Sequence, residues 1–113
     1  MITLDWPPTE LRPNARVHFR AKAAVAKLYR ETAYYRGEKH DLPLPEAGIE
    51  YAAVIKFYPP DKRRRDLDNM LASIKSGVDG LADALGINDR QLNPITIERC
   101  EPVKGGKVVV VIV

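Results

Sequence analysis

Two aspartates spaced one residue apart, Asp66 and Asp68, stand directly after four consecutive cations in the stretch DKRRRDLDNM. Side chains two residues apart in an extended segment point to the same side, so both carboxylates can face one ion where a strand gives way to a helix. Mg²⁺ takes oxygen ligands, commonly one or two carboxylates with water and phosphate in the remaining positions. The pair therefore predicts part of a Mg²⁺ site. The alternative is that Asp68 caps a helix and Asp66 is a solvated surface acid.

Lys75 and Asp89 are the next residues that could join this chemistry. On a continuous helix Lys75 lies about 10 Å along the axis from Asp68, and its side chain leans toward the helix N-terminus. It could reach a phosphate held over the carboxylates, or it could pair with Asp79 four residues on. Asp89 follows a predicted helix end in the stretch GINDRQ. It could fold back to complete a cluster of three carboxylates, or it could serve only as a turn residue.

The four cations before the aspartates are Lys62, Arg63, Arg64 and Arg65. An anion that lies between these cations and the acids explains why the two kinds of charge are adjacent. Arginine and lysine clamp phosphate oxygens, while a metal held by aspartates stabilises charge on the same phosphate. We therefore expect the run to bind a nucleic-acid backbone. A solvated loop and a nuclear-localisation signal are the alternatives for such a run.

A second basic element lies in the stretch LRPNARVHFRAK. Its polar residues fall on even positions: Arg12, Asn14, Arg16, His18, Arg20 and Lys22. An extended stretch would place them on one side, so we also assign Arg12, Asn14, Arg16 and Arg20 to DNA binding. His18 could be an acid-base group, but DNA contact or simple exposure is favoured. Twelve of the 18 Lys and Arg residues lie in ranges 12–39 and 62–65, which is the distribution of a phosphate-binding surface.

The bulk composition is that of one ordinary globular domain. The chain has 113 residues, of which 45% are hydrophobic and 29% charged, and this length suits a single modest core. The net charge of +3 is only mildly basic. The single Cys100 excludes an internal disulfide and fits a reducing compartment. The start MITLDWPP lacks the pattern of a signal peptide, and the apolar end 108–113 is far shorter than the roughly 20 residues of a membrane span, so we expect a cytoplasmic protein that does not bind membranes.

The hydrophobic pattern indicates which elements position these residues. We predict strands over 2–6, 49–58, 95–103 and 107–113, helices over 17–35 and 68–85, and a loop over 37–48. Apolar residues alternate in 49–58. In 17–35 they recur at 17, 21, 24, 28 and 35, with Val25 and Tyr29 widening the stripe, although the helix could begin later if the basic stretch before it is extended. Asp68 and Gly86 supply the start and stop of the second helix.

The last two strands are separated by Gly105 and Gly106, a composition typical of a tight hairpin turn. The valine run of the final strand lacks alternation, so we expect it to be covered on both faces. The elements follow the order β-α-β-α-β-β. We predict an α/β (α+β) fold, in which residues 1–113 form a single domain with one mixed sheet and two main helices.

The run RRRDLDN, 63–69, followed by a helix and then NDRQ, 88–91, resembles the RusA family of Holliday junction resolvases. The opening LDWPP, 4–8, and the ending KGGKVVVVIV, 104–113, are similar to that family's first and last strands. The least similar part is about 16–47. The resemblance implies a small, homodimeric, Mg²⁺-dependent endonuclease that acts on four-way DNA junctions in recombination and repair, in bacterial cells and often carried by phages or prophages.

By matching motif, the resemblance implies that Asp66, Asp68 and Asp89 are catalytic metal ligands, with Mn²⁺ as a substitute for Mg²⁺ and no organic cofactor. It also implies a catalytic lysine, whose usual place is occupied by Ala72. Lys75 takes that role if a short insertion in NMLASIK is allowed. Two other functions stay open at this point: a non-catalytic DNA-binding protein whose acids only cap a helix, and a ribonuclease or less selective nuclease that uses the same carboxylates.

Overall fold

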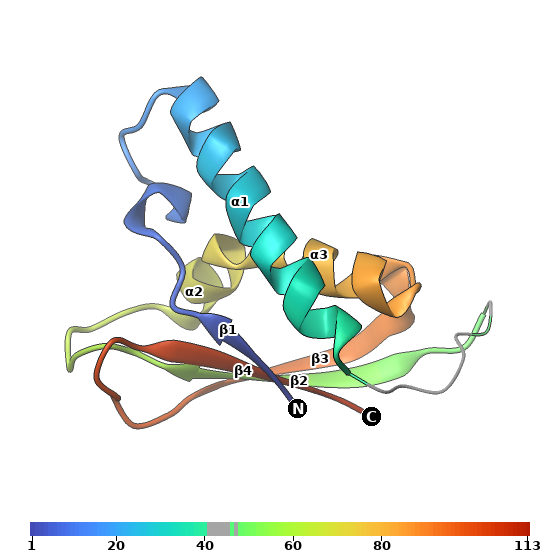
Figure 1. Cartoon of the computed structure of the whole chain (residues 1–113). Helices are drawn as coiled ribbons and strands as arrows, with labels where there is room; N and C mark the ends of the chain where they lie inside the picture. The colour runs from blue at the N-terminus through green and yellow to red at the C-terminus, as the bar shows by residue number, and fades with distance from the viewer. Residues whose placement is uncertain (41–45, 47) are drawn as a thin grey trace.

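A four-stranded mixed sheet carries all three α-helices on one of its faces (Figure 1). The structure is a computed structural model that describes residues 1–40, 46 and 48–113. The strands are β1 (Ile2–Asp5), β2 (Tyr51–Tyr58), β3 (Leu92–Arg99) and β4 (Lys107–Ile112). The helices are α1 (Phe19–Glu38), α2 (Leu67–Ser73) and α3 (Lys75–Leu85), with 3-10 helices η1 (Thr9–Leu11) and η2 (Asp89–Gln91). The predicted class, an α+β domain with a mixed sheet, is confirmed.

The spatial order of the strands is β1-β4-β2-β3, and only β2 and β3 run parallel. The predicted hairpin between the last two strands is therefore wrong, because β2 lies between them. The turn itself exists: Gly105 and Gly106 adopt positive φ values of 79° and 69°, and the amide of Gly106 donates to the Val103 carbonyl at 2.9 Å. The α2–α3 connection brings β3 back parallel to β2, as a helical crossover does, so β4 pairs on the other edge of β2.

The predicted helix 68–85 is divided into α2 and α3. The division lies at Ile74, whose φ and ψ of −103° and 7° leave the helical region and whose side chain is fully buried in the core. Both helices direct apolar residues into the core, Met70 from α2 and Leu81 from α3. The end of α3 is as predicted, because Gly86 takes the left-handed conformation with φ 71°.

Helix α1 begins and ends later than predicted, and of the predicted stripe only Val25 and Tyr29 pack into the core. His18 occupies its N-cap position, where the side chain accepts a hydrogen bond from the Arg20 amide at 3.2 Å. The buried residues are Tyr29, Ala33 and Gly37, whereas Leu28, which the pattern had placed on the apolar face, is 65% exposed. Spacing alone could not separate the two faces, because small and aromatic residues form the buried one.

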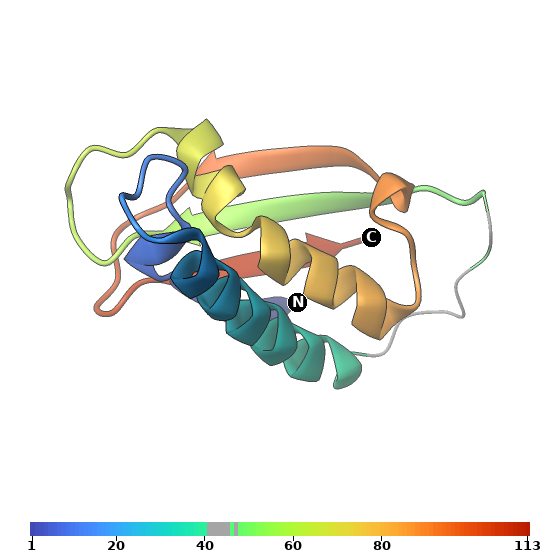
Figure 2. The ribbon, with the colours of Figure 1, turned by 90° about the horizontal axis from the view of Figure 1, so that it is seen from above.

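The core lies between the sheet and helices α1 and α3, which lie side by side across it (Figure 2). Ala53, Ile55 and Phe57 of β2 are buried at alternate positions, as predicted. Val108 and Val110 are buried against the helices, and Val109 on the opposite face is buried as well. No described helix covers that opposite face (Figure 1), so the expectation of a strand covered on both faces is not met. In the predicted loop 37–48, residues 37 and 38 belong to α1, while 41–45 and 47 lie outside the described residues. No helix of the described chain is long and apolar enough to span a membrane.

Candidate nuclease site

Asp66 and Asp68 lie where the chain enters α2. The predicted capping role for Asp68 is wrong, since the helix begins at Leu67 and Asp66 occupies the N-cap position. Asp66 makes no side-chain capping hydrogen bond there, and its nearest partner is the Asn69 amide at 3.5 Å. Both aspartates are exposed, and Asp68 makes no hydrogen bond or ion pair within the described chain. The local fold therefore leaves both carboxylates available to a ligand.

The arginines before this pair form a loop that is shaped from within. The Asp61 carboxylate accepts hydrogen bonds from Arg65 at 2.8 Å and from the Arg63 amide at 2.9 Å, and these bonds lower the pKa of Asp61. The Arg65 side chain is only 15% exposed and lies over the Trp6 ring at 5.5 Å. Arg99 also donates to the Arg65 carbonyl at 2.7 Å. The loop is thus held by Asp61 and Arg65.

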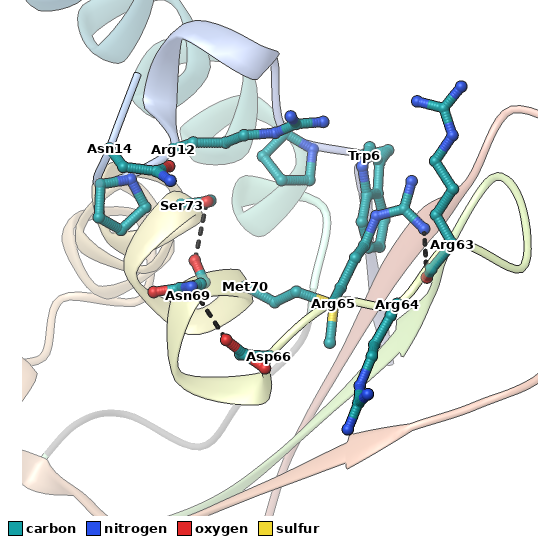
Figure 3. Close-up of a pocket in the computed structure, with 12 residues that line it drawn as sticks. Trp6, Arg12, Asn14, Arg63, Arg64, Arg65, Asp66, Asn69, Met70 and Ser73 are labelled. Carbon is teal, nitrogen blue, oxygen red and sulfur yellow. Dashed lines mark hydrogen bonds between the residues drawn. The ribbon is translucent and has the colours of Figure 1, made fainter. Parts of the chain in front are cut away.

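Arg63 and Arg64 are presented outward by that loop. The Arg63 side chain is 82% exposed, with its Nε 3.9 Å from an Asp61 oxygen, and Arg64 is exposed. Between this loop, α2 and the segment after β1 lies a pocket of about 410 Å³, which we call the arginine pocket (Figure 3). The residues that line it are Trp6, Pro7, Arg12, Pro13, Asn14, Arg63, Arg64, Arg65, Asp66, Asn69, Met70 and Ser73.

The arginine pocket brings together five of the eight residues assigned to DNA binding from the sequence: Arg12, Asn14, Arg63, Arg64 and Arg65. Lys62 instead lines a different hollow, beside Arg99 and Glu101. Arg16 and Arg20 are exposed outside the pocket. The predicted extended run of even positions is wrong beyond His18, since Arg20 lies within α1.

Lys75 and Asp89 are in contact. The Lys75 ammonium donates to Asp79 at 2.7 Å and to Asp89 at 3.5 Å. The Asp79 hydrogen bond raises the pKa of Lys75, against a smaller opposing effect of partial burial, so this side chain is positively charged near neutral pH. The ion pair between Lys75 and Asp79, which the spacing predicted as an alternative, is formed. Lys75, at the start of α3, also reaches Asp89.

Asp89 is positioned by its neighbours in the NDRQ stretch. The Asn88 side chain accepts from the Arg90 amide, and the Gln91 side chain accepts from the Asn88 amide, forming a capping box around η2. The side-chain amide of Gln91 also donates to the backbone carbonyls of Glu46 and Ile49, each at 2.9 Å. This stretch therefore forms a turn, as one of the two interpretations of Asp89 predicted, while the Asp89 carboxylate remains 54% exposed.

The fit of a metal ion can be tested on these positions. Within residues 1–40, 46 and 48–113, no three His, Cys, Asp or Glu side chains lie close enough together to hold a metal ion. Asp66 and Asp68 are nevertheless exposed oxygen donors spaced one residue apart. Two carboxylates with water and phosphate in the remaining positions suit a hard divalent cation. The donor chemistry of this pair fits Mg²⁺, but the extended segment expected to carry both aspartates is wrong, since Asp68 lies within α2. Asp89 is held by Lys75 instead of joining the pair.

Several residues of the site were not assigned a role in it from the sequence. Trp6, Asn69 and Met70 line the arginine pocket, and Asp61 and Asp79 form ion pairs with Arg65 and Lys75. The spacing of four residues in each of these ion pairs was the available signal. The stretch LDWPP could not by itself place Trp6 at this pocket, because Trp6 lies 60 positions before Asp66 in the sequence.

Comparison with known proteins gives three relatives that match nearly the whole chain. An uncharacterized protein of Xylella fastidiosa is 43% identical over 114 residues, which cover 98% of this chain and 74% of the relative. Two crossover junction endodeoxyribonucleases named RusA, from Enterobacteria phage 82 and Shigella sonnei, are each 30% identical over 113 residues, covering 94% of this chain and 87% of the relative. No family model matches the chain.

Proposed function

The chain belongs to the RusA family of crossover junction endodeoxyribonucleases, and from this premise we propose that it is a Mg²⁺-dependent endonuclease that resolves four-way DNA junctions. Residues 1–113 would form one RusA-like domain that acts in the cytoplasm of a bacterial host, in recombination and repair. The observation that carries the proposal is the position of Asp66. It is an exposed carboxylate without a capping bond, and it lines a pocket together with Arg12, Arg63 and Arg64.

The position of Asp66 in the arginine pocket explains why acidic and basic residues are adjacent in the sequence. Four arginines and one aspartate line the arginine pocket, so an anionic ligand is favoured there by charge. The guanidinium groups of Arg63 and Arg64 are free to form paired hydrogen bonds with phosphate oxygens. A DNA strand held in this way passes its backbone over Asp66 and Asp68.

In this proposal Asp66 and Asp68 hold the metal ion, with Asp89 as the third ligand that the family resemblance implies. A divalent cation held there would supply activation of water and stabilisation of charge on the attacked phosphate. The protein's own residues bind and orient the strand. The loop that carries Arg63, Arg64 and Arg65, which we call the arginine loop, fixes the DNA backbone. Asp66 and Asp68 set where the scissile phosphate lies along the strand. Asp89 must exchange its contact with Lys75 in order to join the pair.

Lys75 is the proposed electrostatic catalyst. Its ammonium group is kept protonated by Asp79, and it could neutralise charge that develops on the phosphate in the transition state. An ammonium between Asp79 and Asp89 also limits repulsion among the carboxylates.

A homodimer fits the proposed task. A four-way junction has twofold symmetry, and its resolution needs two matched nicks, so a C₂ pair with one site per subunit would make both cuts.

A panel of substrates tests the proposed function. Labelled four-way junction, linear duplex, single-stranded DNA and RNA are incubated with the protein, with and without Mg²⁺, and with Mn²⁺ in a parallel series. We expect only the junction to be converted to nicked duplexes, and only when a divalent cation is present. Cleavage of linear DNA or RNA at a comparable rate would favour a less selective nuclease. Binding without cleavage in every divalent cation would favour a non-catalytic DNA-binding protein.

A further inference from the structure

The walls of the arginine pocket are more apolar than a phosphate needs. Trp6, Pro7, Pro13 and Met70 contribute flat or flexible apolar surface. Met70 is 4% exposed and belongs to the hydrophobic core. Figure 3 shows its side chain extending from α2 toward Arg65 and Trp6. A surface of this kind suits a planar apolar face, which a phosphate lacks.

The cations of the pocket differ in what they already bind. Arg65 is engaged by Asp61 and packs over Trp6, so it presents a guanidinium plane fixed against an aromatic ring. The side chains of Arg12 and Arg64 make no hydrogen bond or ion pair in the described part of the chain. The pocket therefore combines a fixed stacking wall with free cations, a pairing that nucleic-acid sites use for bases and phosphates respectively.

Two side-chain amides complete the lining. Asn14 lies after β1 and Asn69 on α2, and both line the pocket (Figure 3). The Asn14 amide has no hydrogen-bond partner among the described residues, and the Asn69 amide has only the long contact to Asp66. Amides offer a donor and an acceptor together, which is the pattern that base edges present.

The volume of about 410 Å³ falls within the range of roughly 300–1,000 Å³ found for pockets that hold a small organic group. Asp66 lines the same pocket. If Asp66 holds the catalytic metal, the occupant of the pocket is attached to the strand beside the bond that is cut.

We propose that the arginine pocket holds the base of one unstacked nucleotide next to the scissile phosphate. This inference rests on the proposed function and adds a reason for its selectivity. Removing a base from a continuous duplex costs unpairing and unstacking, and that cost is smallest where a base is already unpaired. At the centre of an open four-way junction the base pairs beside the crossover have lost stacking on one side, so this cost is lower there than inside a linear duplex. Arg65, backed by Trp6, stacks on the base, Asn14 and Asn69 meet its edge, and Arg12 and Arg64 bind the flanking phosphates.

The test uses Trp6, which is the single tryptophan of the chain and therefore reports on the pocket alone. Wild-type protein is titrated, in Ca²⁺ in place of Mg²⁺, with an intact junction and with junctions that carry one abasic nucleotide at each position flanking the crossover. Tryptophan emission and the dissociation constant are measured together. We expect the intact junction to change the emission. We expect one abasic position to abolish that change and to weaken binding about tenfold, the typical effect of losing one stacked base.

A variant locates the base within the pocket. Asn14→Ala removes an exposed amide without changing the core. It should weaken binding of the intact junction. It should leave unchanged the binding of the abasic junction that abolishes the emission change. The proposal is overturned if every abasic junction gives the emission change and affinity of the intact one, because the pocket would then hold phosphate only. An equal loss for Asn14→Ala on intact and abasic junctions would also overturn it.

Cleavage in Mg²⁺ is measured separately on the intact junction. A protein that cuts the junction but shows no dependence on the abasic position refutes the base pocket and keeps the nuclease. A protein that shows the abasic effect but never cuts keeps the pocket and refutes the nuclease.

Discussion

At the scale of single residues, neighbouring arginines of the same run have different environments. Arg65 is tied to Asp61 and covers Trp6, while Arg63 and Arg64 extend from the loop. Charge alone makes these residues equivalent in the sequence. Their contacts indicate that Arg65 shapes the loop and that Arg64 is free for DNA.

Arg64→Ala should weaken junction binding and reduce the slope of log K against log salt concentration by about 1, because one phosphate contact is lost. Binding is measured by fluorescence anisotropy at several salt concentrations. Arg65→Ala is the matched variant: it should change that slope less, and should increase hydrogen exchange of the amides near Arg63, which depend on the Asp61 turn. An equal change of slope in both variants would place Arg65 on the phosphate as well.

Asp68→Asn should abolish cleavage while leaving junction binding unchanged or tighter, since it removes one metal ligand and one negative charge beside the DNA. A loss of several kcal/mol of transition-state stabilisation corresponds to a decrease of at least about 100-fold in rate. Single-turnover cleavage in Mg²⁺ measures the rate, and a mobility shift measures binding. Glu31→Gln, at an exposed position of α1 outside the arginine pocket, is the control for charge alone. Cleavage by Asp68→Asn at the wild-type rate would remove the metal assignment.

At the scale of elements, α1 and α3 are held together by close approach of backbones. A Cβ at Gly80 would lie 2.3 Å from the Arg30 carbonyl oxygen, and one at Gly77 would lie 2.6 Å from the Tyr29 ring. Arg30 also forms an ion pair with Asp83 across the same helix pair. This packing sets where α3 begins, and so where Lys75 meets Asp89.

Gly80→Ala should destabilise the protein by about 2 kcal/mol. Overpacking against backbone costs roughly 1–3 kcal/mol, and the better helix propensity of alanine returns only about 1 kcal/mol or less. Thermal unfolding should show a melting temperature lower by roughly 5–10 °C. Ser76→Ala, on the same helix, is the control and should change stability by no more than about 0.5 kcal/mol. An unchanged melting temperature for Gly80→Ala would mean that α1 and α3 can move apart at this contact without a loss of stability.

Tyr29 links α1 to β1 through a hydrogen bond from its hydroxyl to the Asp5 carbonyl at 2.7 Å. Burial, and then the negative charge of Asp5, raise the pKa of Tyr29. The unfolded chain releases this proton near pH 10, while the folded chain keeps it, so its contribution to stability is complete below about pH 10 and falls as the pH rises further.

Tyr29→Phe should therefore lose about 1 kcal/mol at pH 7, and its deficit relative to wild type should shrink above about pH 10. Urea unfolding of both proteins at pH 7 and at about pH 10.5 measures the two differences. A deficit that stays constant over this range would show that the hydroxyl is not held protonated by the fold.

At the scale of the whole molecule, the helices cover one face of the sheet, and the arginine pocket lies at the end where the segment after β1, the arginine loop and α2 meet (Figure 1). Asp89 precedes β3, which runs parallel to β2. One chain thus presents one pocket with one pair of free carboxylates, and a symmetric junction needs two such sites.

Mixing wild-type protein with an excess of Asp68→Asn should convert resolution into single nicking, because a mixed dimer keeps only one competent site. Denaturing gels should show cut strands, while native gels retain the four-way junction in a nicked form. Wild-type protein diluted with buffer to the same concentration is the control. If the mixture still yields resolved duplexes in the proportion that the wild type alone gives, the two cuts do not depend on a stable pair of subunits.

The sequence by itself determined the α+β class, the alternation in β2, the end of α3 at Gly86 and the membership of the RusA family, because each depends on local residue types or on direct identity with relatives. It also identified the arginines and aspartates at the entrance of α2. These features are encoded within a few consecutive residues, where backbone geometry decides the direction of each side chain.

Only the tertiary structure decided that β4 lies between β1 and β2, that the second helix breaks at Ile74, and that Trp6 and Arg12 meet Asp66 in one pocket. It also decided which arginines are already bound. The physical reason is that strand pairing and pocket formation depend on packing summed over segments far apart in the chain. Gly105 and Gly106 formed the predicted turn, for example, but the edge of β2 that was free for β4 depended on where the α2–α3 crossover placed β3.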